Sequence, residues 1–250
     1  MEPISIQSTD LRPTTFFVFG ERNSGTNFVH SLLLKNFLWP FAPATQRIEQ
    51  FGHRHGWKHG FPSAYTAPHD LLAVVVFRDP ETWIRSLHNK PWHTHRSMRW
   101  RPIAEFIRLE WHCIIDDPNF GIAKDDPRWG QELMIERDPV TGERFANIAH
   151  LRNAKNRGFL SMKARYDNVV HVRYEAVRDD PQGFVDLLAA RYGLARAGDF
   201  APVEGNRGHA NKEYTPKVYE ELSDDDRRFI WDALDAAQEA KLGYLRPDDL

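Results

Sequence analysis

The sequence predicts an α/β protein, built as a single domain around a central parallel sheet that is flanked by helices. Two stretches carry this prediction. A run of aromatic and β-branched residues at 16–19 leads through a glycine-containing loop into a helical pattern, and a fully apolar run at 71–77 leads directly into a second helix start. Strands that alternate with helices pair in parallel, because each helix returns the chain to the same end of the sheet.

Composition sets limits on the class of protein. The chain has 250 residues, 27 % of them charged and 41 % hydrophobic, which suits one globular domain with a sizeable core. Its net charge of −2 gives no general attraction to nucleic acid, so we expect no nucleic-acid partner. The single cysteine, Cys113, excludes an intrachain disulfide and fits a reducing compartment. With no signal-peptide pattern and only short apolar runs, we expect a cytoplasmic protein without a membrane span.

The first strand, predicted at 16–19, ends in a loop with the spacing of a phosphate-binding loop. Gly20 and Gly25 stand five residues apart, where backbone N–H groups and a helix N-terminus favour an anion. An ordinary strand-to-helix turn is the alternative interpretation. A loop that binds a magnesium nucleoside triphosphate would continue with Lys and then Ser or Thr, but this chain has Thr26 and Asn27. The donors in and beside the loop therefore favour an anion bound without metal: Arg22, Ser24, Thr26 and Asn27.

A second strand-to-helix turn follows. The first helix should end near Pro40, and residues 41–68 should form an irregular loop with a short strand within 53–58. The strand at 71–77 ends at Arg78, after which Asp79 is the expected helix N-cap and Pro80 the first helical residue. Ser86 lies eight residues after Arg78, near the end of that helix. Because parallel strands end at one edge of the sheet, Arg78 and Ser86 should lie beside the first loop.

The second half of the chain alternates in the same way. Residues 91–101 combine aromatics with three arginines; 103–115 should form an amphipathic helix, and 116–141 a polar, proline-containing insertion. A helix at 148–164 and a strand at 169–174 should follow, and then a helix at 182–192 that Asp180-Pro181 should cap and Gly193 should close. Two more helices are expected after the loop 205–212, with Ser223 as the cap of the final one, which runs to about residue 241. The helix at 148–164 should carry a basic face: Arg152, Lys155, Arg157 and Lys163.

Taken together, the two turns resemble the binding motifs of sulfotransferases, which use 3′-phosphoadenosine 5′-phosphosulfate as donor. The first motif, with its Ser-Gly-Thr core, spans residues 22–28, RNSGTNF. The second is Arg78-Asp79-Pro80 followed by Ser86. A strand that ends in Tyr-Glu, here at 174–175, and a Leu-Gly-Tyr near the C-terminus, here at 242–244, are also typical of the family. The resemblance covers most of the chain and is least secure at the variable insertion, about residues 91–165.

The resemblance implies one sulfotransferase-like domain over residues 1–250, with a fold like that of P-loop nucleoside triphosphatases. It implies transfer of a sulfonate group to an acceptor hydroxyl, of a carbohydrate or another polar metabolite, from a donor with two anionic ends and no metal. Arg78 and Ser86 would hold one end, and Tyr174 would either touch the adenine or be part of the core. Arg207 and Lys212 would cover the 3′-phosphate, or belong to a solvated turn. The first loop would hold the other end: Arg22, Asn23, Ser24, Gly25, Thr26, Asn27 and Phe28, the last either stacked on adenine or part of the core.

Two roles in catalysis are assigned on the same resemblance. Many members have a lysine just before the Ser-Gly-Thr core, where this chain has Asn23; Arg22 is the first candidate to replace it and Lys58 the second. The segment 58–62, KHGFP, resembles the family element that carries the base, so His59 is the expected base and Lys58 a contact of the sulfonate or leaving group. A hydrogen-bonded loop histidine without chemistry is the plain alternative for His59. Further candidates for the base are His53, His55 and the carboxylate of Glu110.

Other functions remain open at this point. His53 and His55, or His93 and His95, could bind a metal because alternate residues of a strand face the same way, but no carboxylate or cysteine stands at ligand spacing, so we predict no metal. A P-loop kinase is a second enzyme class, which Thr26 disfavours. A nucleotide-binding protein of the same fold without catalysis is a third possibility, because Asn23 replaces the lysine.

Overall fold

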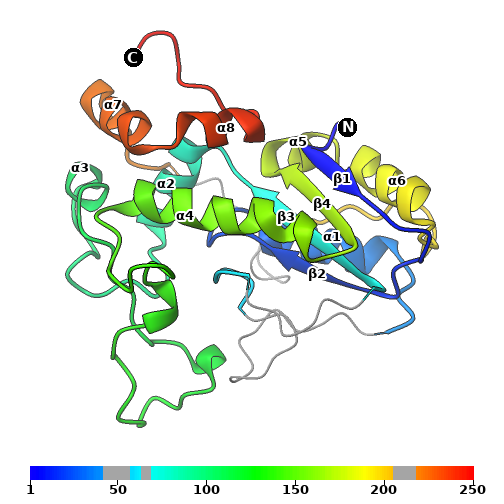
Figure 1. The fold of residues 1–250 in the computed structure, drawn as a ribbon, viewed down its shortest axis with the longest axis horizontal. Helices are drawn as coiled ribbons and strands as arrows, with labels where there is room; N and C mark the ends of the chain where they lie inside the picture. Colours follow the sequence, from blue (N-terminus) through cyan, green and yellow to red (C-terminus); the bar gives the residue numbers. More distant parts are fainter. Residues whose placement is uncertain (42–56, 63–68, 205–217) are drawn as a thin grey trace.

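The computed structural model describes residues 1–41, 57–62, 69–204 and 218–250, and within them the chain forms a mixed α/β fold around one four-stranded sheet (Figure 1). The strands are β1 (Ser5–Gln7), β2 (Thr15–Phe19), β3 (Leu71–Phe77) and β4 (Asn168–Arg173), in the order β1-β4-β3-β2. β2, β3 and β4 are parallel, as predicted. β1 pairs antiparallel with β4. The polar sequence of β1, SIQ, gave no sign of a strand.

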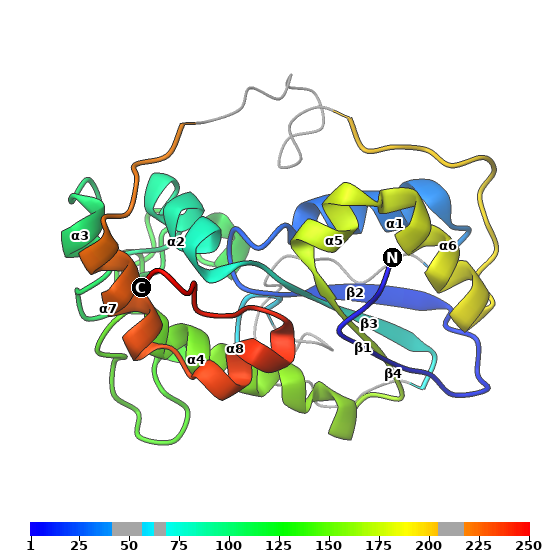
Figure 2. The same cartoon turned by 90° about the horizontal axis from the view of Figure 1, so that it is seen from above.

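Helices cover both faces of the sheet (Figure 2). Side chains of successive strand residues point to opposite faces, so Phe16 and Val18 belong to one hydrophobic cluster, whereas Phe17 and Phe19 belong to the other. The first cluster includes residues from α1 (Thr26–Asn36), α5 (Tyr174–Asp179) and α6 (Pro181–Tyr192). The second includes residues from α2 (Pro80–Asn89), α3 (Ile103–Phe106), α4 (Ile148–Leu160) and α7 (Asp224–Ala233), together with α8 (Ala236–Leu242). β3 is buried along its whole length, as its apolar run predicts.

The three parallel strands end at one edge of the sheet. Phe19 pairs with Val75, and Phe77 pairs with Arg173, so the turns that follow β2, β3 and β4 lie next to one another. Each turn leads directly into a helix: α1, α2 or α5. This arrangement confirms the prediction that the two binding-motif turns share an edge.

Cap residues predicted from the sequence are confirmed. Asp79 accepts a hydrogen bond from the Thr82 N–H, which starts α2, and Asp180 accepts one from the Gly183 N–H, which starts α6. Gly193 ends α6 with a φ of 62°. Short polar side chains and glycine thus set the ends of these helices locally.

The predicted helix at 103–115 is wrong beyond its first turn. Only Ile103–Phe106 forms α3, and the chain that follows pairs with a distant segment instead. The Ile115 N–H donates to the Gln131 carbonyl, and the Leu133 N–H donates to the Cys113 carbonyl, each at 2.9 Å. Long-range backbone pairing has overridden the local amphipathic pattern.

Ser223 caps α7, which is the first of the two C-terminal helices rather than the last. The helical pattern is interrupted after Ala233, because Asn153 of α4 binds the backbone there: its Nδ2 donates to the Ala233 carbonyl and its Oδ1 accepts from the Asp235 N–H, both at 2.9 Å. Asp235 then caps α8.

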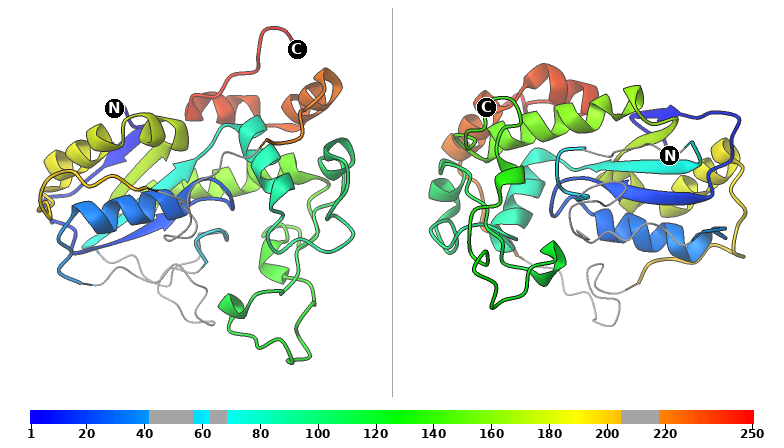
Figure 3. Two further views of the ribbon diagram at one scale, coloured as in Figure 1. Left: turned by 180° about the vertical axis from the view of Figure 1, so that it is seen from behind. Right: turned by 60° about the horizontal axis from the view of Figure 1, so that its bottom comes forward.

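Residues 91–146, which include α3, form a lobe beside α2, on the side of the molecule away from α6 (Figure 3). The lobe contains two short 3-10 helices, η1 (Pro118–Phe120) and η2 (Met134–Glu136). α4 follows it and continues as η3 (Ser161–Ala164). The described part of the chain contains no helix long and apolar enough to cross a bilayer.

Candidate functional site

The turn between β2 and α1, residues 20–25, is called the phosphate loop below, after the ligand that its glycine spacing predicts. Its shape depends on positive φ angles at Gly20 (150°), Asn23 (62°) and Gly25 (96°). Gly25 is the N-cap residue of α1, and no side chain caps the helix. A helix N-terminus without a capping side chain is suited to an anion, because its N–H groups and dipole favour negative charge.

Ser24 supplies a hydroxyl inside this loop. Its Oγ is buried, and it has no hydrogen-bond partner among the described residues. A Cβ on Gly20 would lie 2.7 Å from this Oγ and 2.5 Å from the Val76 carbonyl, so only glycine fits there. Buried hydroxyls in folded proteins are nearly always hydrogen-bonded, so an unpaired one in a phosphate loop indicates a ligand position.

Tyr174, the first residue after β4, packs directly on the phosphate loop. A Cβ on Gly25 would lie 2.2 Å from the Tyr174 Cδ2, so this close approach requires glycine. The Arg78 guanidinium lies 5.2 Å from the centroid of the same ring. Phe28 meets that ring edge-on at 6.2 Å but is itself 3 % exposed within the core. The structure thus brings Tyr174 to the site and buries Phe28 in the core, so little of the Phe28 ring is left to stack on adenine.

The second motif reaches the same loop. Arg78 Nη1 donates to the Asn23 carbonyl at 2.8 Å, while its buried Nε has no partner in the described part of the chain. The Ser86 carbonyl accepts from Asn23 Nδ2 at 2.8 Å, and the Lys90 carbonyl accepts from the same group at 3.2 Å. Asn23 therefore ties the loop to the end of α2, and Arg78 and Ser86 lie beside it.

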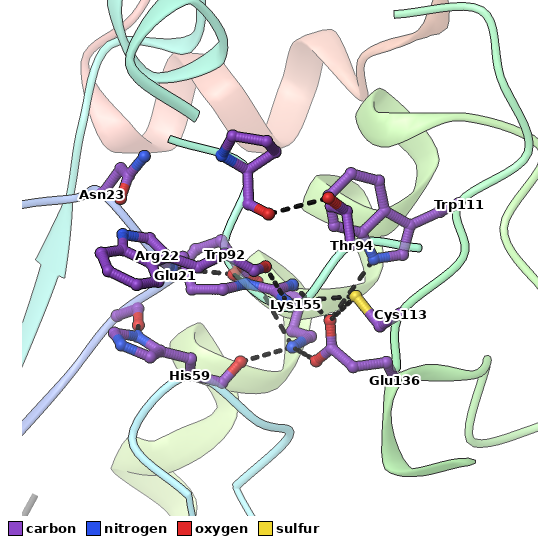
Figure 4. Close-up of polar contacts among 12 residues, drawn as sticks. Glu21, Arg22, Asn23, His59, Trp92, Thr94, Trp111, Cys113, Glu136 and Lys155 are labelled. Atoms are coloured by element: carbon purple, nitrogen blue, oxygen red, sulfur yellow. Dashed lines mark hydrogen bonds and ion pairs between the residues drawn. The ribbon is translucent and has the colours of Figure 1, made fainter. Parts of the chain in front are cut away.

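Arg22 points away from the loop into the protein interior (Figure 4). Only 1 % exposed, its guanidinium binds Glu21 through Nε at 2.7 Å and Glu136 through Nη2. Its Nη1 lies 3.2 Å from Cys113 Sγ and 3.3 Å from the Trp92 carbonyl. All three guanidinium nitrogens have partners, so this geometry leaves Arg22 poorly placed for the leaving-group role that its sequence position suggested.

Lys58 places a second cation, besides Arg78, next to the loop. Its Nζ donates to Asn27 Oδ1, in the first turn of α1, at 2.6 Å, and its carbonyl accepts from the Gly20 N–H at 3.0 Å. The side chain is buried, and this burial lowers the pKa of Lys58 to about 8. Near neutral pH, most Lys58 side chains therefore carry a positive charge, which adds to that of the helix N-terminus.

His59 is held in one tautomer. Its Nδ1 lies 2.6 Å from the Gly20 carbonyl, which can only accept, so Nδ1 must carry the proton and Nε2 of the neutral ring carries the lone pair. Burial, reinforced by the Lys58 charge, holds the pKa of His59 well below its usual range. The imidazole is therefore neutral at pH 7 and can accept a proton at Nε2.

A buried charge network lies behind these residues: Glu21, Arg22, Glu136 and Lys155. Lys155 Nζ binds Glu136 and the His59 carbonyl and lies 3.3 Å from Glu21 Oε2. Burial alone would raise the pKa of Glu21, but Arg22 and Lys155 more than offset this and lower it to about 2. Burial raises the pKa of the Cys113 thiol to about 12, so this cysteine is a neutral contact.

Sequence reasoning missed most of this network. The expected basic face of α4 is wrong for Arg152 and Lys155, which are both buried in ion pairs. Glu136 lies in a polar stretch that carries no motif, and only its long-range contacts reveal it. For Glu21, the one signal in the sequence is its position directly after Gly20 of the loop.

Glu110, His93 and His95 lie in the lobe, and the His93 ring meets that of Trp57, which also meets the His59 ring. Glu110 pairs with Arg144 at 3.0 Å in the lobe. His93 Nδ1 bonds to Asp116 Oδ1 at 2.7 Å, whereas His95 stacks on His112 with centroids 4.4 Å apart. In the ranges that the structure describes, no group of three or more side chains could hold a metal ion. Four candidates fall outside the described residues: His53, His55, Arg207 and Lys212.

The site therefore combines the phosphate loop with three side chains: the buried Lys58, Arg78, and the neutral His59 in a defined tautomer. Comparison with protein-family models, with curated proteins and with solved structures finds no match to this chain.

Proposed function

We propose that the chain is a sulfotransferase of P-loop-like fold, which moves a sulfonate group from 3′-phosphoadenosine 5′-phosphosulfate to an acceptor hydroxyl. The observation that supports this most is the pairing of Lys58 with the first turn of α1, beside the unpartnered Ser24 hydroxyl. A cation is thus present at the loop without the Lys-Ser/Thr sequence that serves a magnesium triphosphate.

The residues of the two strand-to-helix turns fit a donor with two anionic ends. The phosphate loop would hold the 5′-phosphosulfate, and Arg78 with Ser86 would hold the 3′-phosphate. Ser24 Oγ and Arg78 Nε support this division, because both are buried polar atoms without a partner in the described structure and a bound oxyanion would satisfy each of them. Tyr174 lies between the two motifs, where an adenine could contact it.

The chemistry needs a base and a cation. In the transfer, the bond between sulfur and the bridging phosphate oxygen breaks, and a bond between sulfur and the acceptor oxygen forms. His59 Nε2 takes the proton of the acceptor hydroxyl, while Nδ1–H stays on the Gly20 carbonyl. The electron pair of the broken bond stays on the phosphate oxygen, where the Lys58 ammonium stabilises the added charge.

A polar, hydroxyl-bearing acceptor such as a sugar suits the surface beside the loop. Trp92 is 46 % exposed, and the Lys90 ammonium lies 5.9 Å from the centroid of its ring. Arg22 binds the Trp92 carbonyl, and Asn23 binds that of Lys90, so both residues are anchored to the loop segment. An exposed tryptophan offers a flat face on which a sugar ring can stack.

Isothermal titration calorimetry tests the donor. We expect 3′-phosphoadenosine 5′-phosphate to bind with the same affinity in magnesium and in EDTA, because the residues of the loop bind an anion directly. ATP with magnesium should bind more weakly. Tight binding of magnesium ATP, with no heat from the bisphosphate, would overturn the proposal and favour a P-loop kinase.

A transfer assay tests catalysis. With radiolabelled donor and a panel of sugar and other hydroxyl acceptors, the wild-type protein should label at least one acceptor. His59→Ala should slow transfer by roughly 10²–10⁴-fold, because the proton acceptor is lost, and leave bisphosphate affinity nearly unchanged. His95→Ala, which removes a histidine of the lobe, is the matched control and should keep full activity. Bisphosphate binding without transfer to any acceptor would point to a nucleotide-binding protein that has no catalytic activity.

A further inference from the structure

We propose that Glu136 is a positioning residue of this site, which holds the phosphate loop and His59 in register through Arg22 and Lys155. The inference rests on the proposed function for its meaning in catalysis, but its geometry can be tested separately. It assigns a role to a residue of the lobe, which the family resemblance treats as a variable insertion.

Glu136 bridges the two cations of the buried network. Its Oε2 accepts from Arg22 Nη2, and its Oε1 accepts from Lys155 Nζ (Figure 4). The Trp111 Nε1 lies 3.4 Å from the same Oε2. Both carboxylate oxygens are therefore engaged, and Glu136 comes from η2, 114 residues from Arg22 and 19 from Lys155 in sequence.

Each cation also holds one part of the site. Lys155 Nζ donates to the carbonyl of His59, whose ring donates to the carbonyl of Gly20. Arg22 lies within the phosphate loop, and its own carbonyl accepts from Trp83 Nε1 of α2 at 2.8 Å. A shift of Glu136 would therefore act on both sides of the contact between His59 and Gly20.

The network is balanced in charge, with two carboxylates and two cations that are all buried. A buried charge without its partner is costly, so each member constrains the position of the others. Loss of the Glu136 charge would leave Arg22 and Lys155 with Glu21 as the single remaining carboxylate of the network. Repulsion between the two cations would then move Lys155 away from the His59 carbonyl.

A second buried ion pair provides the control, and it involves α4, the helix that contains Lys155. Arg152 of α4 binds Glu239 of α8 through Nε at 2.6 Å and Nη2 at 2.7 Å. It lies one helical turn from Lys155 and is equally buried. Glu239→Gln removes the buried carboxylate of α8 that pairs with α4, and it leaves the described contacts of His59 in place.

The test compares Glu136→Gln, Glu239→Gln and the wild type by NMR of ¹⁵N-histidine-labelled protein. The signal of the His59 Nδ1 proton, assigned by its loss in His59→Ala, reports the contact with Gly20. We expect Glu136→Gln to broaden or remove this signal and to weaken bisphosphate binding about tenfold, equivalent to about 1.4 kcal/mol. Glu239→Gln should lower the melting temperature but leave both the signal and the affinity unchanged.

A double variant covers the case in which Glu136→Gln does not fold. Glu136→Gln with Lys155→Met removes one charge of each sign and keeps the Glu21–Arg22 pair, so it should fold more stably than either single variant. Because the Lys155 contact to the His59 carbonyl is gone, the Nδ1 signal should still be altered.

An unchanged His59 signal in folded Glu136→Gln, or in the double variant, would overturn the inference. The same loss of signal in Glu239→Gln would also overturn it, because it would reveal general destabilisation. If the wild-type protein does not bind the bisphosphate, the proposed function fails, yet the histidine signal still decides whether Glu136 positions His59.

Discussion

At the scale of single residues, the direction of a side chain favours one of two candidates for the proposed leaving-group role. Arg22 lies in the phosphate loop by sequence, but its guanidinium is enclosed by Glu21 and Glu136. Lys58 lies more than thirty residues away in the chain, and its ammonium reaches Asn27 of α1. Sequence position alone ranks these residues in the opposite order, because it contains no information on where a long side chain points.

We predict that Lys58 makes bisphosphate binding depend on pH. Its lowered pKa of about 8 means that the ammonium loses its proton as pH rises through about 8, so affinity should fall over this range. Lys58→Ala should cost roughly 1.5–3 kcal/mol of binding free energy at pH 7, the usual worth of a hydrogen bond to a charged group. Calorimetry between pH 6.5 and 9.5 measures both effects.

Lys58→Arg is the matched variant for this prediction. Arginine stays charged throughout the range, so the decline above pH 8 should disappear even if the affinity at pH 7 is lower. A wild-type affinity that stays constant from pH 6.5 to 9.5 would contradict the assignment of Lys58 to the loop.

At the scale of elements, the site is formed by the contact between two strand-to-helix turns. The phosphate loop precedes α1 and Tyr174 opens α5, and these turns meet because Gly25 has no side chain. The parallel pairing of β2, β3 and β4 brings the turns to one edge, whereas glycine permits the final approach.

We predict that Gly25→Ala opens this contact. The added Cβ would lie 2.2 Å from Tyr174 Cδ2, so the ring must move, at a cost of about 1–3 kcal/mol in stability beyond the backbone strain at φ 96°. Gly130→Ala is the control, because its φ of 82° is similar but its Cβ would meet nothing within 4 Å, leaving about 1–2 kcal/mol of backbone strain. Urea denaturation measures both variants; equal losses of stability would show that the contact with Tyr174 is unimportant.

The success of sequence reasoning differed between kinds of element. Helix ends set by local chemistry, such as the Asp79 cap of α2 and the Gly193 end of α6, were predicted correctly. Errors arose where a distant part of the chain supplied the hydrogen bonds, as at the end of α3 and at the Asn153 contact between α7 and α8. In the site, the sequence indicated the two motif turns, but not the inward direction of Arg22 or the presence of Glu136.

At the scale of the whole molecule, buried and half-buried histidines make stability depend on pH. Burial is the main reason that the pKa values of His30 and His171 are lowered to about 4 and that of His59 is also depressed. In the unfolded chain each would titrate near its ordinary value of about 6.5. Below that pH the unfolded state binds more protons than the folded state, so acid favours unfolding.

We therefore predict that the free energy of unfolding is constant near pH 7.5 and falls as pH drops from about 6.5 to about 4. The slope should reach up to about 1.4 kcal/mol per pH unit for each histidine. Urea denaturation at pH 7.5, 6.5, 5.5 and 4.5 measures it. His69→Ala, which removes an exposed histidine whose pKa is raised by Asp167, should leave the decline in place. A free energy of unfolding that does not change between pH 7.5 and 4.5 would contradict the prediction.

The balanced charges of the four-residue network behind His59 limit how the sequence of this protein can change during evolution. Replacing any one of Glu21, Arg22, Glu136 or Lys155 leaves an excess charge in a dry interior, so a lineage that alters one should soon alter a second of opposite sign. These positions should therefore be inherited or exchanged as matched pairs among descendants, even though three separate stretches of the gene encode them.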